Sequence, residues 1–212
     1  AQNKTYFVSP SGNDTADGLS VKTAWKSIDK VNNSIFQAGD KVLFEGGQTF
    51  YGNMVIKSSG TPENPIIFSG YGNGRPIINI GEKEGTAITI QNADGLEING
   101  FEITCGLPPK VGVGRNGIQI DENESGKAFN HIVIRDNFIH DIWGQMGGTH
   151  IRNAAISGGV SRSWRQSSEK KTPATLDDVL IEGNRIERVD KVGITTSGIG
   201  KLRVRRNYMD NL

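Results

Sequence analysis

The chain has one cysteine, almost no net charge and no long apolar run, and each shortage excludes a class of protein. Cys105 is the only cysteine among 212 residues, so no disulfide can form within the chain. The formal net charge of +1 gives no overall attraction to nucleic acid or to a lipid surface. No apolar segment approaches the roughly 20 residues that a membrane helix needs. The sequence therefore predicts neither a nucleic-acid partner nor a membrane span.

Several motifs of cofactor and nucleophile chemistry are missing as well. The chain has no glycine-rich phosphate loop, no Cys/His spacing typical of zinc sites and no nucleophile elbow. Its 28 glycines, with many Asn and Asp residues, instead favour a fold that bends every few residues. We therefore expect no cofactor.

The chain contains a short strand motif that recurs and ends in asparagine. Three copies cover residues 133–137, 180–184 and 203–207, and a fourth at 96–101 carries Phe101 in place of the asparagine. Ile181 and Val204, which hold the same place in two copies, are 23 residues apart. This length suits one turn of three short strands and three bends. Repetition of such a unit indicates a solenoid, in which Ile98, Ile134, Ile181 and Val204 form one inward column.

A second repeated strand shows where the coils differ in length. Ile118, Ile156 and Ile194 hold the same place in successive coils. In the compact coil 13 residues separate Ile181 from Ile194, whereas 22 separate Ile134 from Ile156. The return path is longer as well, so extra chain emerges on both sides of one strand column. Insertions on one face of a solenoid commonly build its binding face, and two rows of loops beside one sheet predict a groove.

The domain organisation follows from the same repeat. We expect one β-helix domain over residues 1–212, with an N-terminal cap and first coils over 1–70 and regular coils with long loops over 71–212. Trp25, Ile28 and Val31 stand at helical spacing, which predicts a short amphipathic capping helix. No polar capping element follows the last repeat. We therefore expect further coils beyond residue 212, or another chain, to pack on that end.

The N-terminal motifs resemble those of a known superfamily. The segments are 6–14 (YFVSPSGND), the helix with Trp25, 38–42 (AGDKV), 59–66 (SGTPENPI) and 70–72 (GYG). Together they resemble the opening of extracellular right-handed parallel β-helix proteins of the pectate-lyase-like superfamily. The resemblance implies an all-β, right-handed parallel β-helix and a carbohydrate substrate. Similar openings occur in polysaccharide lyases and in glycoside hydrolases. The calcium-binding aspartate cluster of pectate lyases is not found, so calcium is expected only if the protein is a lyase.

The start of the chain bears on its location. Ala1 takes the place of an initiator Met and a strand pattern begins almost at once, which is typical of a mature end left by signal-peptide removal. We expect a secreted, periplasmic or cell-surface protein.

The groove has a predicted floor and a predicted charged edge. Strand alternation sends Gln119, Ser157 and Thr195 outward, where small or uncharged groups make a floor for a sugar chain. At the edge where these strands begin, Arg115, Arg152 and Lys191 are expected to form a basic column, with Asp190 beside it. Arginine can grip a carboxylate through two hydrogen bonds, so the column predicts a uronate or sulfated sugar. The alternative is a solvated turn with scattered charges.

The two loop rows would form the walls. Trp164, beside Arg165, stands in a polar segment whose pattern does not place it in the core. It is a candidate platform for sugar stacking. The other wall offers His140, Asp141, Trp143 and His150. For two of these residues the favoured interpretation is structural: Trp143 packs under its own loop, and His140 is a surface residue. Asn137, Asn184 and Asn207 are interpreted as a structural column of stacked amides.

Three functions are compatible with these residues. A glycoside hydrolase, slightly favoured, would need two carboxyls beside the bond, and Asp121, Asp190 and Glu122 are candidates. A polysaccharide lyase would need a cation and a base, and Arg152, Lys191 and His150 are the candidates for these roles. A non-catalytic glycan-binding or scaffold β-helix is the third. The expected partner in each case is a polysaccharide or oligosaccharide, with an acidic one favoured by the basic column.

Overall fold

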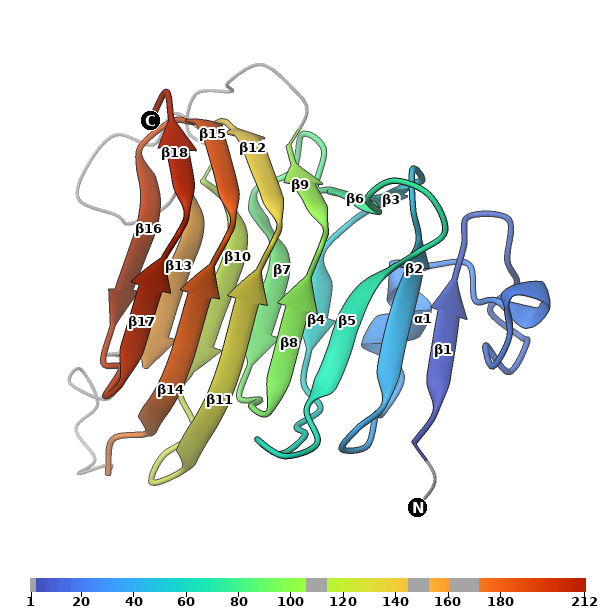
Figure 1. The fold of residues 1–212 in the computed structure, drawn as a ribbon, viewed down its shortest axis with the longest axis horizontal. Coiled ribbons are helices and arrows are strands. Elements are labelled where there is room, and N and C mark those ends of the chain that lie inside the picture. The colour runs from blue at the N-terminus through green and yellow to red at the C-terminus, as the bar shows by residue number, and fades with distance from the viewer. Residues whose placement is uncertain (1–2, 106–113, 145–152, 161–171) are drawn as a thin grey trace.

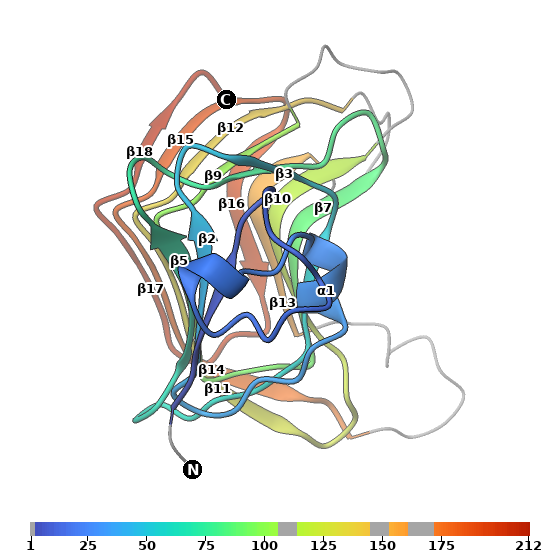
Figure 2. The ribbon, with the colours of Figure 1, turned by 90° about the vertical axis from the view of Figure 1, so that its right-hand side faces the viewer.

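The computed structural model describes residues 3–105, 114–144, 153–160 and 172–212. In these residues the chain winds into successive coils, and each regular coil contributes one strand to each of three sheets (Figure 1). Every pairing between neighbouring strands is parallel. A view turned by 90° shows the three sheets surrounding a common interior (Figure 2). The chain is a parallel β-helix, as the repeat predicted, and its right-handed sense stays a prediction.

The three sheets are named by their strands. Sheet A contains, in spatial order, β1 (Thr5–Val8), β2 (Lys41–Glu45), β5 (Ile66–Tyr71), β8 (Leu96–Asn99), β11 (Ala128–Arg135), β14 (Thr175–Glu182) and β17 (Leu202–Arg205). Sheet B contains β3 (Thr49–Tyr51), β6 (Ile77–Asn79), β9 (Glu102–Thr104), β12 (Phe138–Ile142), β15 (Arg185–Val189) and β18 (Tyr208–Asp210). Sheet C contains β4 (Met54–Ile56), β7 (Gly85–Gln91), β10 (Arg115–Glu122), β13 (Ala154–Val160) and β16 (Val192–Ser197).

The core consists of columns of apolar side chains that stack from coil to coil. Ile98, Ile134, Ile181 and Val204 are in register, which confirms the column predicted from the repeat. The first three are fully buried, and Val204 is 44% exposed. Strand alternation places every second residue inward, so this register brings the repeated isoleucines together.

An asparagine ladder holds the bend between sheets A and B. The side-chain oxygen of Asn184 accepts hydrogen bonds from the backbone nitrogen and the side-chain amide of Asn137, both at 3.0 Å. Asn207 accepts the equivalent pair from Asn184 at 3.0 and 2.9 Å, and Phe101 donates its backbone N–H to Asn137. Each amide also donates to a carbonyl of the preceding coil. The predicted structural column is therefore confirmed.

The N-terminal region differs from the prediction in one respect. The helix α1 spans only Ile28–Asn32, and a 3-10 turn, η1, spans Val21–Thr23. Trp25 lies outside the helix: it forms an isolated bridge with Val8, and its ring stacks on Tyr6 at a centroid distance of 4.8 Å. Hence the helical spacing of Trp25 was misleading, and a capping helix through Trp25 is wrong.

The short helix joins the edge of sheet C. The Asn32 side chain donates to the carbonyl of Asn53 at 2.9 Å and accepts from the backbone N–H of Val55 at 2.8 Å. Among the described residues, no helix is both long and apolar enough to cross a bilayer.

Candidate functional site

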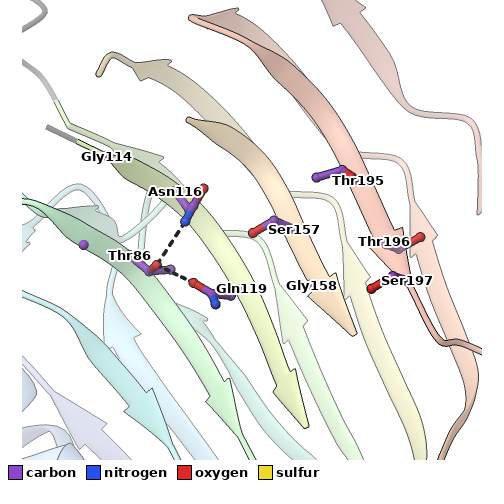
Figure 3. Close-up of a pocket in the computed structure, with 10 residues that line it drawn as sticks. Thr86, Gly114, Asn116, Gln119, Ser157, Gly158, Thr195, Thr196 and Ser197 are labelled. Atoms are coloured by element: carbon purple, nitrogen blue, oxygen red, sulfur yellow. Dashed lines mark hydrogen bonds between the residues drawn. The ribbon is translucent and has the colours of Figure 1, made fainter. Parts of the chain in front are cut away.

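A cleft of about 520 Å³ crosses the outer face of sheet C at β7, β10, β13 and β16 (Figure 3). Its volume is within the range of small-molecule sites. The cleft contains all three residues of the predicted floor, and Gln119, Ser157 and Thr195 are in register on adjacent strands. The lining residues are Gly85, Thr86, Gly114, Asn116, Gln119, Ser157, Gly158, Thr195, Thr196 and Ser197.

The described lining carries no charged side chain. It consists of glycines, hydroxyl groups and two carboxamides. Adjacent strands in a sheet are about 4.8 Å apart, so these groups form a closely spaced field of hydrogen-bond donors and acceptors. Such a surface matches the hydroxyl groups of an uncharged sugar better than a carboxylate, which needs a cation or several N–H donors.

Two glycines shape the middle of the cleft. Gly158 and Gly159 have φ of 109° and 131°, a region that other residues rarely adopt. A Cβ at Gly158 would lie 1.9 Å from the carbonyl oxygen of Ile120, and one at Gly159 would lie 2.0 Å from that of Ser197. Because both residues are glycines, β13 has no side chain at positions 158 and 159. Thr196, which alternation places inward, is half-buried and lines the cleft.

The predicted basic column is wrong at Arg115. This side chain is fully buried, and its guanidinium donates to the carbonyls of Lys83 at 3.2 Å, Trp143 at 2.8 Å and Glu82 at 2.7 Å. The Arg115 guanidinium therefore links residues 82–83 to Trp143 at the upper end of sheet C, where β10 begins. The register also pairs Asn116 with Ala154, which brings Asn153 rather than Arg152 beside Arg115. The Arg115 backbone N–H donates to Asn153 Oδ1 at 2.9 Å.

Asp190 and Lys191 lie at the same end of the sheet and are exposed. The carboxylate of Asp190 accepts a hydrogen bond from the side-chain amide of Asn153 at 3.2 Å. Asn153 is itself buried, with φ of 74°. The amide therefore links Asp190 to the backbone of Arg115 across three coils. His150, Arg152, Trp164 and Arg165 lie outside the described residues.

The two acidic residues at the end of β10 have opposite environments. Asp121 is half-buried on the outer face, in register with Gln91 on one side and with Gly159 on the other. Because Gly159 has no side chain, the Asp121 carboxylate is uncrowded on that flank. Glu122 points inward and is fully buried, with no hydrogen-bond partner for either carboxyl oxygen among the described residues. Burial raises the pKa of Glu122 to about 8, with the neighbouring Asp94 and Asp121 adding to the effect. Glu122 is thus removed from the candidates at the groove edge.

Two of the residues proposed for the other wall, His140 and Asp141, belong to a separate charged cluster on the outer face of sheet B. His140 lies between Asp141, at 2.5 Å, and Glu102, at 3.1 Å. Arg188 binds both oxygens of Asp141 at 2.7 and 2.8 Å, and it holds the pKa of that carboxyl at about 2. Within the described parts of the chain, no group of three or more His, Cys, Asp or Glu residues could hold a metal ion.

Thr86 and Asn116 were missed from the sequence. Asn116 follows Arg115 at the start of β10, and Thr86 precedes the inward residues of β7. Thr86, Asn116 and Ala154 form one register column, whereas the next paired column begins two residues later at Ile118. Gly117 is thus skipped in the pairing with both neighbouring strands. On either side of it, Asn116 and Gln119 both line the cleft (Figure 3). Strict alternation would have placed them on opposite faces.

The fold and the cleft together define a parallel β-helix protein with the architecture of carbohydrate-active proteins. No family model matches the chain. It is 24% identical to a lacto-N-biosidase of Bifidobacterium longum subsp. longum over 97% of its length, although it spans only 16% of that protein.

Solved structures agree on the fold. The GH136 lacto-N-biosidase from Eubacterium ramulus matches with a TM-score of 0.82 and 22% identity, over 99% of this chain and 42% of that chain. A rhamnogalacturonan lyase matches with a TM-score of 0.53 and 16% identity, over 99% of this chain and 62% of that chain. The same coil therefore occurs in a hydrolase and in a lyase.

Proposed function

We propose that this chain forms the β-helix of a glycoside hydrolase that binds an oligosaccharide in the cleft on sheet C. The observation that carries the proposal is the continuous polar floor of Gln119, Ser157 and Thr195 across three coils. The similarity to lacto-N-biosidases supports hydrolysis rather than elimination. The lack of charge in the described lining supports an uncharged sugar in place of the acidic one expected at first.

Hydrolysis of a glycosidic bond requires two carboxyl groups beside that bond. We assign one of these roles to Asp121, which borders the floor. Asp190, held by Asn153, lies at the opposite end of the sheet, because Val192 is in register with Asn116 through Ala154. Asp121 and Asp190 are therefore about seven residues, or roughly 20 Å, apart along the strands, too far to flank one bond. Asp121 would protonate the leaving oxygen, act as nucleophile or activate water. A second candidate function, non-catalytic glycan binding, is favoured by the separation of Asp121 from Asp190, which leaves Asp121 without this carboxyl as a catalytic partner.

A direct assay separates the possible reactions. The protein is incubated with a chromogenic lacto-N-bioside and with neutral and acidic polysaccharides, and new reducing ends and ultraviolet absorbance of an unsaturated product are measured. A hydrolase gives reducing ends alone, a lyase gives both signals, and a binding protein gives neither. Absence of product from every substrate, with retained binding, would overturn the enzymatic proposal.

Variants test the two carboxyls. Asp121→Asn should lower kcat about 100-fold or more, the scale of general acid–base catalysis. Asp190→Asn should leave kcat within a few-fold of wild type, because Asp190 lies at the opposite end of sheet C. Asp136→Asn is the matched control, because Asp136 lies exposed at the bend between sheets A and B. Equal activity in Asp121→Asn and in the control would exclude Asp121 as a catalytic group.

The location of the protein and its other partners are proposals of the same kind. We propose an exported protein that requires no cofactor. Its signal sequence and its partners at the C-terminal end are tested by expressing the natural gene and identifying the mature N-terminus and any associated chain.

A further inference from the structure

Three polar side chains at the upper end of the cleft form a hydrogen-bonded chain with one direction. The Asn116 oxygen accepts from the backbone N–H of Ala154 at 3.2 Å, which leaves the Asn116 amide nitrogen facing Thr86. That nitrogen lies 3.5 Å from the Thr86 hydroxyl oxygen, a long contact. The Thr86 hydroxyl then lies 3.0 Å from the Gln119 side-chain oxygen (Figure 3).

The direction of the chain follows from its first member. A backbone N–H can only donate, so the Asn116 oxygen is its acceptor and the amide orientation is fixed. Thr86 is buried, and Gln119 is the one acceptor for its hydroxyl hydrogen among the described residues. If the Gln119 amide were reversed, its nitrogen would donate to Thr86, and the hydroxyl hydrogen would be buried without an acceptor. A buried donor without a partner is unfavourable.

We propose that Gln119 is a specificity-determining residue that presents its amide nitrogen, a hydrogen-bond donor, to the ligand, and that Thr86 and Asn116 are positioning residues that fix this orientation. The side-chain nitrogen of Gln119 has no acceptor among the described residues, and Gln119 lines the cleft. The sugar atom that meets it must therefore be an acceptor oxygen. This inference rests on the proposed function, since it assigns the polarity of the same cleft.

The first test is a set of affinities for lacto-N-biose, measured by titration calorimetry. Gln119→Ala removes the donor and should weaken binding about 10-fold, the scale of one hydrogen bond. Gln119→Glu replaces the donor with an acceptor and should weaken binding about 30-fold or more at neutral pH. Gln48→Glu is the control, because it adds the same charge at an exposed residue between β2 and β3, outside the cleft lining. This variant should bind normally. Tighter binding by Gln119→Glu than by Gln119→Ala would overturn the assigned polarity.

The second test separates positioning from simple structural support. Thr86→Val removes the hydroxyl at nearly constant volume and should weaken binding about 5-fold, whereas Thr86→Ser should restore it. In a Gln119→Ala background, Thr86→Val should have no further effect, because Thr86 acts through Gln119. An equal loss in both backgrounds would show that Thr86 only supports the fold and would overturn its role.

A third test needs no ligand and distinguishes failure of the inference from failure of the proposed function. In the free protein, nuclear magnetic resonance should show only weak cross-relaxation between the Gln119 amide hydrogens and the Thr86 methyl group. Strong cross-relaxation would mean that the amide nitrogen faces Thr86, which overturns the assigned polarity. If this test agrees but lacto-N-biose does not bind, the proposed substrate is wrong and the polarity of the floor stands.

Discussion

The cleft on sheet C and the charged face on sheet B are built on the same strand spacing. They differ in whether their outward polar side chains already have partners within the described chain. The charged face consists of Glu102, Phe138, His140, Asp141, Arg185, Glu187 and Arg188. Its cations and carboxylates contact one another, from the pair of Arg188 with Asp141 to the pair of Arg185 with Glu187. In the cleft, by contrast, the Gln119 nitrogen has no partner in the described chain.

The difference shows where a ligand could gain hydrogen bonds. Like charges stacked at about 4.8 Å repel unless an opposite charge compensates them, and on sheet B arginine side chains pair with the carboxylates. A ligand there would have to break existing ion pairs. The uncharged groups of sheet C do not repel one another, so they can stack while some donors stay available. The predictions below test this contrast.

The largest effect is expected from adding a methyl group to the cleft floor. Gly158→Ala would bring a Cβ to 1.9 Å from the Ile120 carbonyl oxygen at a φ of 109°, and we expect a loss of about 4 kcal/mol or more in unfolding free energy. Gly52→Ala is the matched control, because Gly52 has φ of 124° but open space around the new Cβ. It should cost only about 1–2 kcal/mol. Equal losses in urea denaturation would contradict the role of close packing in shaping the cleft.

The asparagine ladder, rather than the ion pairs, should stabilise the coil beneath the charged face. Asn184→Ala removes an acceptor for two Asn137 donors and a donor to the Ile134 carbonyl. We expect about 3 kcal/mol of destabilisation, since these groups are buried. Asn207→Ala, at the partly exposed end of the ladder, should cost about 1 kcal/mol. Thermal unfolding of both variants checks this, and a milder effect for Asn184→Ala than for Asn207→Ala would be inconsistent with it.

An unpaired carboxyl behind the cleft should make stability depend on pH, unlike the paired carboxyls of sheet B. The pKa of Glu122 is raised from 4.5 to about 8 in the folded protein. The folded state therefore keeps its proton while the unfolded state loses it, and stability falls as pH rises through this window. From about pH 6 to pH 8 the unfolding free energy should drop by about 2 kcal/mol, and Glu122→Gln should abolish this contribution. An unchanged pH profile in Glu122→Gln would show that Glu122 is not the group responsible.

The smallest effect is expected on the charged face itself. Arg188→Met should lower stability by about 1 kcal/mol or less, because the guanidinium is partly exposed. The pKa of Asp141 is lowered from 3.8 to about 2, so the stabilisation is present above pH 3.8 and is lost as pH falls through about 2. The difference between wild type and Arg188→Met should narrow over that range. Lacto-N-biose binding should be unaltered, and a lower affinity would mean that sheet B contributes to the site.

Much of the fold could be predicted because the repeat encodes it directly. The column of Ile98, Ile134, Ile181 and Val204 and the asparagine ladder follow from equal spacing of equal residues. The floor residues were predicted for the same reason, since Ile118, Ile156 and Ile194 fix the register of β10, β13 and β16. Alternation then places Gln119, Ser157 and Thr195 on the outer face.

The errors lie where local pattern and tertiary contact disagree. Arg115 has the sequence position of an exposed edge residue, but three backbone carbonyls from two other segments converge on its guanidinium and bury it. Trp25 has helical spacing, but its ring packs on Tyr6 and its backbone pairs with β1. Neither set of partners is adjacent in sequence, so no local pattern could reveal them.

The sequence by itself determined the coil: a repeated apolar phrase and a recurring asparagine specify which residues stack, because each unit can bury its apolar side only against the next copy. Only the tertiary structure decided which polar groups remain available. Arg115 is buried because carbonyls from other coils converge on its guanidinium, and Asn116 lines the cleft beside Gln119 although strict alternation would place it inward. Hydrogen-bond satisfaction is a property of the assembled neighbours, and for that reason the cleft and its polarity emerge only in the folded chain.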